Sequence, residues 1–111
     1  MTLAPAPVLP RRLGLVIARA HAWPLVLGLA HAALVQRADV RIFAMDRAVA
    51  ADALAANRIA LCTLVEVGVH VAFCATSLDD YHSVAPPGVE IGSQLDHARL
   101  LQWATRVVAL T

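Results

Sequence analysis

Four short apolar runs recur along the chain, and each is rich in residues that favour β-strands. They occupy residues 12–18, 39–45, 69–74 and 106–110. The segments between them carry apolar residues at helical spacing, which predicts helices over 23–38, 51–67 and 94–105. Strands that alternate with helices are typical of an α/β fold. We therefore expect a three-layer sandwich in which helices cover both faces of a mostly parallel sheet of four to five strands.

The length of 111 residues suits a single domain, which we place over residues 12–111. The preceding stretch begins "MTLAPAPVLP" and is rich in proline and alanine, so we expect residues 1–11 to form a flexible N-terminal arm. Gly68 is predicted to end the second helix. The segment 83–93 contains Pro86-Pro87-Gly88 and is the one predicted loop long enough to suggest a function of its own.

The composition narrows the class of function. Apolar residues make up 59% of the chain, whereas roughly 45–50% is usual, and this surplus favours burial in a homo- or hetero-oligomer. The net charge of +1 argues against a nucleic-acid partner, because such proteins carry a clustered basic face. No membrane span is expected, since the apolar stretch 25–35 is shorter than the roughly 20 residues required.

The chain also lacks the signatures of secretion, metal binding and nucleotide binding. Its first apolar run is interrupted by Arg19 and is too short for a signal peptide, so we expect a cytoplasmic protein. Two cysteines do not make a disulfide scaffold, and no histidine pairs with them at zinc-site spacing. There is no glycine-rich phosphate loop. We expect no metal and no organic cofactor.

Cys74 is the candidate catalytic residue. It ends the third predicted strand in "GVHVAFCATSLDDYHS", and α/β proteins gather their sites outside the carboxyl ends of strands. Thr76 or Ser77 could cap a short helix behind it, whose N-terminus would stabilise a thiolate. Asp79 and Asp80 oppose this interpretation, because their charge would raise the pKa of the thiol if they faced it. A buried, inert cysteine is the alternative.

The second cysteine and two histidines could assist Cys74. Cys62 lies in the apolar middle of a predicted helix and is interpreted as a packing residue. It would serve as a resolving thiol only if its helix face turned toward the end of the third strand. His82 follows Cys74 in the next loop, and a Cys–His pair would activate the thiol. His21 ends the first strand and could approach the same edge of the sheet.

Two other polar residues are interpreted as structural. His70 alternates with apolar neighbours in the third strand, which is typical of a core or interface histidine. Asp46 follows the second strand as a lone carboxylate, and we predict that it is a helix N-cap rather than an acid or base.

Several stretches resemble the DsrE/DsrF-like family of sulfur-relay proteins. A long Ala/Leu helix follows the first strand, and "VRIFAMDRAV" is similar to the family's second strand with its Phe and Asp. "LVEVGVHVAFCATSL" resembles the family's helix, Gly-Val turn, strand and cysteine. "LLQWATRVVAL" is similar to its closing helix and strand. The likeness covers nearly the whole chain after residue 11, although each motif is short. The chain departs from the family in "SLDDYHS", where active carriers often have Arg-Gly, and at Ala48, where glycine is common.

The resemblance implies a parallel-rich α/β sandwich that assembles into oligomers. It also implies that Cys74 carries sulfane sulfur as a persulfide, accepting it from a donor protein and passing it to an acceptor thiol. Some members lack the cysteine and act only as partner subunits. Two alternatives thus stay open: a non-catalytic structural or regulatory subunit, and a small-ligand binding module that uses the carboxyl edge of the sheet and the 83–93 loop.

Overall fold

The computed structural model describes residues 11–111, and its centre is a sheet of five parallel strands. The strands are β1 (Arg12–Ile17), β2 (Asp39–Ala44), β3 (His70–Cys74), β4 (Glu90–Gly92) and β5 (Arg106–Leu110). Their order across the sheet is β4-β3-β2-β1-β5. The strands therefore all end at one edge, where β3 is flanked by β2 and β4. The segment expected to form the arm, apart from Arg11, lies outside the described residues.

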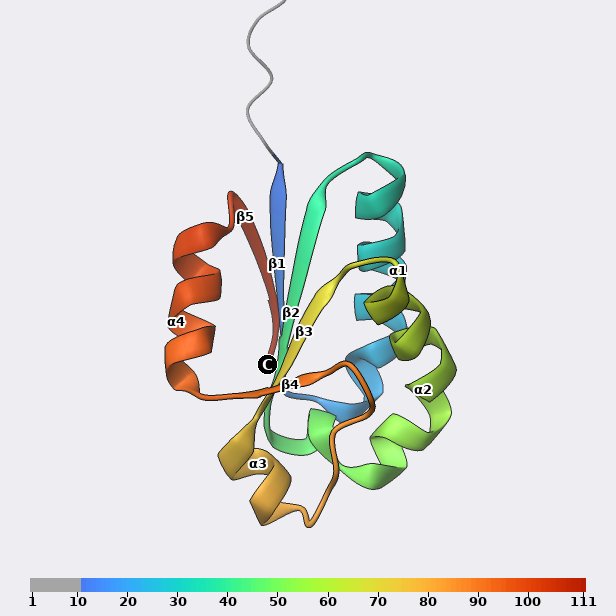
Figure 1. The fold of residues 1–111 in the computed structure, drawn as a ribbon, viewed down its shortest axis with the longest axis vertical. Helices are drawn as coiled ribbons and strands as arrows, with labels where there is room; N and C mark the ends of the chain where they lie inside the picture. The colour runs from blue at the N-terminus through green and yellow to red at the C-terminus, as the bar shows by residue number, and fades with distance from the viewer. Residues whose placement is uncertain (1–10) are drawn as a thin grey trace, which may run out of the picture.

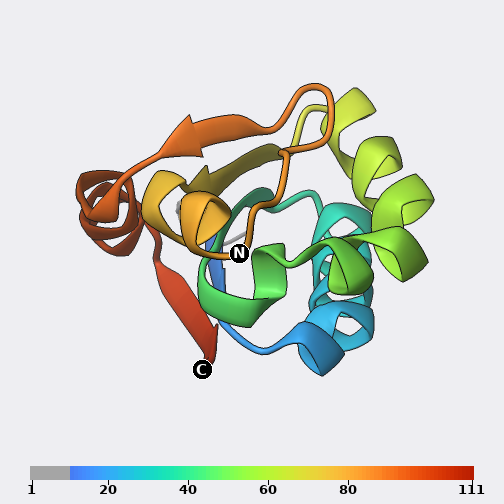
Figure 2. The ribbon, with the colours of Figure 1, turned by 90° about the horizontal axis from the view of Figure 1, so that it is seen from below.

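Helices lie on both faces of this sheet (Figure 1). The four α-helices are α1 (Trp23–Val35), α2 (Ala51–Glu66), α3 (Ala75–Asp80) and α4 (Gln94–Trp103). Two short 3-10 helices, Ala20–Ala22 and Asp46–Val49, follow β1 and β2. Helices α1 and α2 cover one face, α4 covers the other, and α3 lies at the carboxyl edge (Figures 1 and 2). The three-layer α/β architecture expected from the sequence is confirmed.

The predicted strands agree closely with the observed ones, but β4 was not predicted as a separate element. It has three residues, forms the edge of the sheet and is largely exposed. Its pairing with β3, from Ala72 opposite Glu90 to Cys74 opposite Gly92, is what holds it in the sheet. Neither face of this strand is fully buried, so it needs no apolar run, and the sequence pattern does not predict it.

The two faces of the sheet have unequal cores. The larger core lies between the sheet and helices α1 and α2 and contains Trp23 and Phe73, both fully buried. Trp23 Nε1 donates to the carbonyl of Ala48 at 2.8 Å, which satisfies the polar atom of a buried ring. The smaller core lies under α4. It consists of Val16, Phe43, Ala72, Cys74 and Leu100, with Met45 packed against it.

Local signals explain where the helices begin and end. Gly68 follows α2 with a φ of 95°, a conformation that suits glycine, and it ends the helix as predicted. Ser93 and Asp96 form a capping box at the start of α4. Asp46 does not have the predicted role, because Met45 is the N-cap of the 3-10 helix there. Asp46 is instead the first residue of that helix, and its φ of 51° turns the chain after β2.

Candidate functional site

Cys74 is the last residue of β3 and the N-cap residue of α3. It thus lies at the carboxyl edge of the sheet, on the face that α4 covers, with the short helix behind it that the sequence predicted. Its side chain is 5% exposed. The start of α4 also reaches this residue, because Gln94 places its amide nitrogen 3.9 Å from the sulfur.

Polar groups around the sulfur favour its charged form. Burial on its own raises the pKa of the Cys74 thiol, because it removes a thiolate from water. Hydrogen bonds from the Ser77 hydroxyl, the backbone of Ser77 and Thr76, and the Gln94 amide outweigh this effect, so the pKa of Cys74 lies below its ordinary value of 9.0. The thiolate is the nucleophilic form of cysteine, and this setting increases its population near neutral pH.

The Ser77 hydroxyl is held in place by the loop after β2. The backbone N–H of Asp46 donates to Ser77 Oγ at 2.8 Å, and Ser77 is itself buried. An oxygen that accepts this hydrogen bond has its own hydrogen free to point at Cys74. The unusual backbone turn at Asp46 thus contributes to the site through its N–H group, while the exposed carboxylate of Asp46 takes no part in this contact.

Gln94 and His97 form a second support for the sulfur. Gln94 Nε2 donates to Cys74 Sγ at 3.9 Å and to Met45 Sδ at 3.8 Å, while Gln94 Oε1 is 3.0 Å from His97 Nδ1. Since an amide oxygen only accepts, His97 must donate from Nδ1. The His97 ring stacks on Phe43 with the centroids 5.2 Å apart. This contact fixes the ring, and the ring fixes the direction of the Gln94 amide.

The structure does not pair the predicted histidines with Cys74. His82 lies beyond the C-terminal end of α3, is exposed and is joined to Cys74 by no hydrogen bond. His21 is exposed in the 3-10 helix after β1, likewise without a hydrogen bond to Cys74. Asp79 and Asp80, at the far end of α3, are both exposed. The histidine linked to Cys74 is His97, through Gln94.

The structure places Cys62 away from Cys74, as its interpretation as a packing residue implies, but it does not place His70 in a core. Cys62 is on α2, which packs against the opposite face of the sheet from Cys74, so the two thiols do not adjoin within one chain. His70 is not a core residue. Its side chain is partly exposed on the α4 face, and its Nε2 is 2.9 Å from Glu90 Oε2.

The residues missed by sequence reasoning are Gln94 and His97. They follow Cys74 by 20 and 23 positions, and the pairing of β4 with β3 brings them to the sulfur. Because β4 lacks the apolar run typical of a strand, its pairing with β3 could not be predicted from the sequence. The positions of Gln94 and His97 next to Cys74 depend on that pairing. Ser77 was noted as a possible cap, but its contact with Asp46 depends on the turn after β2.

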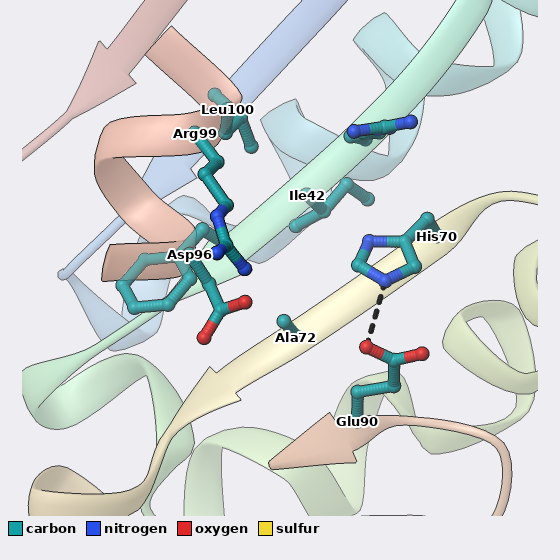
Figure 3. Close-up of a pocket in the computed structure, with 9 residues that line it drawn as sticks. Ile42, His70, Ala72, Glu90, Asp96, Arg99 and Leu100 are labelled. Atoms are coloured by element: carbon teal, nitrogen blue, oxygen red, sulfur yellow. Dashed lines mark hydrogen bonds and ion pairs between the residues drawn. The ribbon is translucent and has the colours of Figure 1, made fainter. Parts of the chain in front are cut away.

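A cavity of about 210 Å³ adjoins this site on the α4 face (Figure 3). Its floor includes Phe43 and Ala72, which also pack in the small core with Cys74. Among residues 11–111 no group of His, Cys, Asp and Glu side chains is arranged to hold a metal ion. In the same part of the chain no helix has the length and apolar character needed to cross a membrane.

Comparison with known proteins gives a structural likeness without a sequence match. The crystal structure of the YchN protein from E. coli aligns with a TM-score of 0.63 and 22% sequence identity. The alignment covers 92% of this chain and 100% of YchN. The comparison shows that this chain shares the fold of YchN, a five-stranded parallel sheet with helices on both faces. No family model and no curated protein matches the sequence.

Proposed function

We propose that the protein is a sulfur carrier that holds sulfane sulfur as a persulfide on Cys74 and passes it to a partner thiol. The observation that carries this proposal is the hydrogen-bonded setting of Cys74, in which the pKa of the thiol is lowered despite burial. Its position at the carboxyl edge of a parallel sheet supports the same role. The DsrE-like fold shared with YchN adds support at the level of fold.

The proposed reaction is an exchange between sulfur atoms. The Cys74 thiolate attacks the terminal sulfur of a donor persulfide, the donor's S–S bond breaks, and the donor cysteine leaves as a thiolate. Cys74 then carries a neutral persulfide, Cys74–S–SH, beside the hydrogen-bond donors of Ser77 and Gln94. An acceptor thiolate attacks the terminal sulfur in turn and regenerates the Cys74 thiolate. No electrons are gained or lost overall, so this chemistry requires no metal or redox cofactor.

Access to the buried sulfur would depend on Gln94. Its side chain lies against Cys74 and is exposed to solvent on its other side. Exposed side chains change rotamer within picoseconds to nanoseconds. Rotation of this one side chain would uncover the thiol without any movement of the sheet.

The proposal implies protein donors and acceptors and an oligomer of identical or different subunits. Apolar side chains on the outer surfaces of α1 and α2 are exposed, which supports association with another subunit. The proposed setting is the cytoplasm, where reducing conditions would keep both cysteines as thiols.

The test is to incubate the protein with inorganic polysulfide and measure its intact mass. We expect an added mass of one sulfur atom that is absent in Cys74→Ser and retained in Cys62→Ser. Reduction by dithiothreitol should remove it. Cys62→Ser is the matched control, because it removes the cysteine on the opposite face of the sheet.

Two results would contradict the proposal. One is the absence of any adduct together with slow alkylation of Cys74 in the folded protein, which a non-catalytic subunit with an inert thiol would give. The other is an adduct on Cys62 alone. Each result would reject Cys74 as the carrier.

A further inference from the structure

The cavity on the α4 face is bounded by charged side chains of both signs. Arg99 and Asp96 come from α4, Arg41 from β2, and His70 and Glu90 from β3 and β4 (Figure 3). Arg41 is held over the ring of Trp103, with its guanidinium carbon 4.2 Å from the ring centroid. The capping box fixes Asp96, whose Oδ2 accepts from Ser93 N at 2.6 Å. Several of these groups are thus oriented by contacts of their own.

This charge pattern selects among ligands. A purely anionic ligand would face the carboxylates of Asp96 and Glu90, and a purely cationic ligand would face two guanidinium groups. A ligand that carries both a carboxylate and an ammonium group can match both signs. Arginine binds carboxylates with two parallel hydrogen bonds, which favours the same conclusion. A volume of about 210 Å³ limits the ligand to the size of an amino acid or a very short peptide.

The cavity lies beside Cys74 along one strand. Every second residue of β3 lies on the same face of the sheet, which places Cys74 on the face of His70 and Ala72. His70 and Ala72 line the cavity. Successive residues on one face are about 6.6 Å apart, so the cavity wall at Ala72 is one such step from Cys74. Phe43 and Ala72 contribute both to the floor of the cavity and to the core around the sulfur. Cys74 itself does not line the cavity, so the side chain of a ligand held there must extend past Ala72 to reach the sulfur.

We propose that this cavity binds a small thiol with an α-carboxylate and an α-ammonium group, such as free cysteine or a short cysteine peptide, as one acceptor of sulfur from Cys74 beside partner proteins. The sulfur transfer in this inference rests on the proposed carrier function of Cys74. The identity of the ligand rests only on the charged residues and the size of the cavity. Arg99 and Arg41 bind the carboxylate, and Glu90 or Asp96 binds the ammonium group.

The transfer step is balanced without a further reactant. The acceptor thiol loses its proton to solvent and attacks the terminal sulfur of the Cys74 persulfide. A new S–S bond forms to the acceptor, the bond to Cys74 Sγ breaks, and Cys74 leaves as a thiolate with the electron pair. Exchange of this kind is faster when the leaving thiol has a lower pKa, which fits the hydrogen bonds around Cys74.

The kinetic test measures sulfur transfer from persulfidated protein to cysteine, cysteamine and 3-mercaptopropionate. Each rate constant is divided by that of the same thiol with a small-molecule persulfide, which removes differences in intrinsic reactivity. We expect cysteine to exceed both thiols that carry one charged group by at least about tenfold, the effect of one lost charge-assisted hydrogen bond. Arg99→Gln should remove the preference for cysteine over cysteamine, which lacks the carboxylate. Arg58→Gln, at an exposed position of α2, should keep it. Equal normalised rates for the three thiols would overturn the proposal.

A binding test separates the cavity from the carrier chemistry. S-methylcysteine has both charged groups but no thiol, and its binding can be followed by NMR shifts of residues around the cavity. Saturable binding that is weakened in Arg99→Gln supports the assigned ligand, even if Cys74 accepts no sulfur. Absence of binding overturns it, even if Cys74 loads with sulfur. Failure of the proposed function and failure of this inference therefore give different results.

Discussion

At the scale of single residues, the chemistry of Cys74 depends on four hydrogen-bond donors rather than on a neighbouring cation. Burial disfavours the thiolate, and the donors of Ser77, Thr76 and Gln94 more than offset that effect. No charged group is needed for this result. The aspartates that argued against a reactive cysteine in the sequence are exposed at the far end of α3. The balance between desolvation and hydrogen bonding is therefore the property to test.

Replacing Ser77 by alanine should raise the pKa of Cys74, because it removes a hydroxyl that lowers this pKa. The rate of iodoacetamide alkylation follows the thiolate fraction, so its pH midpoint should move upward and the rate at pH 7 should fall. Thr76→Ala is the matched control, since Thr76 acts through its backbone, which the substitution keeps. If the two variants have the same midpoint, the Ser77 hydroxyl does not act on the thiol.

Replacing Gln94 by glutamate should also raise the pKa of Cys74, since a carboxylate takes the place of an amide donor 3.9 Å from the sulfur. Persulfide formation at pH 7 should slow accordingly. Gln102→Glu makes the same chemical change on the same helix at an exposed position and should leave the rate unchanged. Equal rates in both variants would show that Gln94 does not govern the thiol.

At the scale of elements, helix α4 decides the shape of the site. It provides Gln94 and His97 on one side of Cys74 and Asp96 and Arg99 in the cavity. Its approach to the sheet depends on Gly14, because a methyl group there would lie 2.5 Å from Leu100 Cδ2 and 3.0 Å from the Cβ of Ala104. The second of these atoms cannot rotate away. The closeness of α4 is thus set by a residue on the strand beneath it.

Gly14→Ala should lower the free energy of unfolding by about 1–3 kcal/mol, the usual effect of overpacking a core. It should also speed alkylation of Cys74, because α4 must move outward. Urea denaturation and alkylation rates measure the two effects. Gly28→Ala is the control: a methyl group at that exposed position of α1 meets open space. It should stabilise the protein by about 0.5–1 kcal/mol through helix propensity. Equal stability of Gly14→Ala and the wild type would refute this account of α4.

At the scale of the whole molecule, the fold was more predictable than the site. The apolar runs predicted β1, β2 and β3, since buried strands need such runs, and they predicted the apolar edge strand β5 as well. They also predicted α1, α2 and α4 from helical spacing. The neighbours of Cys74 were not predictable in the same way. Ser77 is oriented by the turn at Asp46. Gln94 is positioned by the pairing of β4 with β3, and the exposed strand β4 has no apolar run from which it could be predicted.

The high apolar content of the chain bears on how whole molecules associate. Three large apolar residues are exposed on the helices that cover one face of the sheet: Leu25 and Val35 on α1, and Ile59 on α2. We expect the protein to self-associate through this layer, with a mass in sedimentation at least twice that of the chain at micromolar concentration. Ile59→Glu should shift the protein toward monomer, because Ile59 is 85% exposed in the single chain and would be buried in the assembly.

Val84→Glu is the matched control for this experiment. Val84 is 82% exposed, but it lies in the loop before β4 rather than on α1 or α2. It should leave the mass unchanged. A monomeric wild-type protein, or dissociation by Val84→Glu but not by Ile59→Glu, would contradict association through the α1 and α2 layer.

Helix α4 joins β4 to β5, which are the two opposite edges of the sheet. The helix that covers Cys74 therefore also connects one edge strand, β4, to the other, β5, which is the last strand of the chain. Any event that loosens the docking of this last part, including partial unfolding from the C-terminus, uncovers the sulfur at the same moment. The thiol thereby becomes a probe of the closing segment: any alkylation of Cys74 beyond the rate that rotation of Gln94 allows measures the added exposure from that local opening.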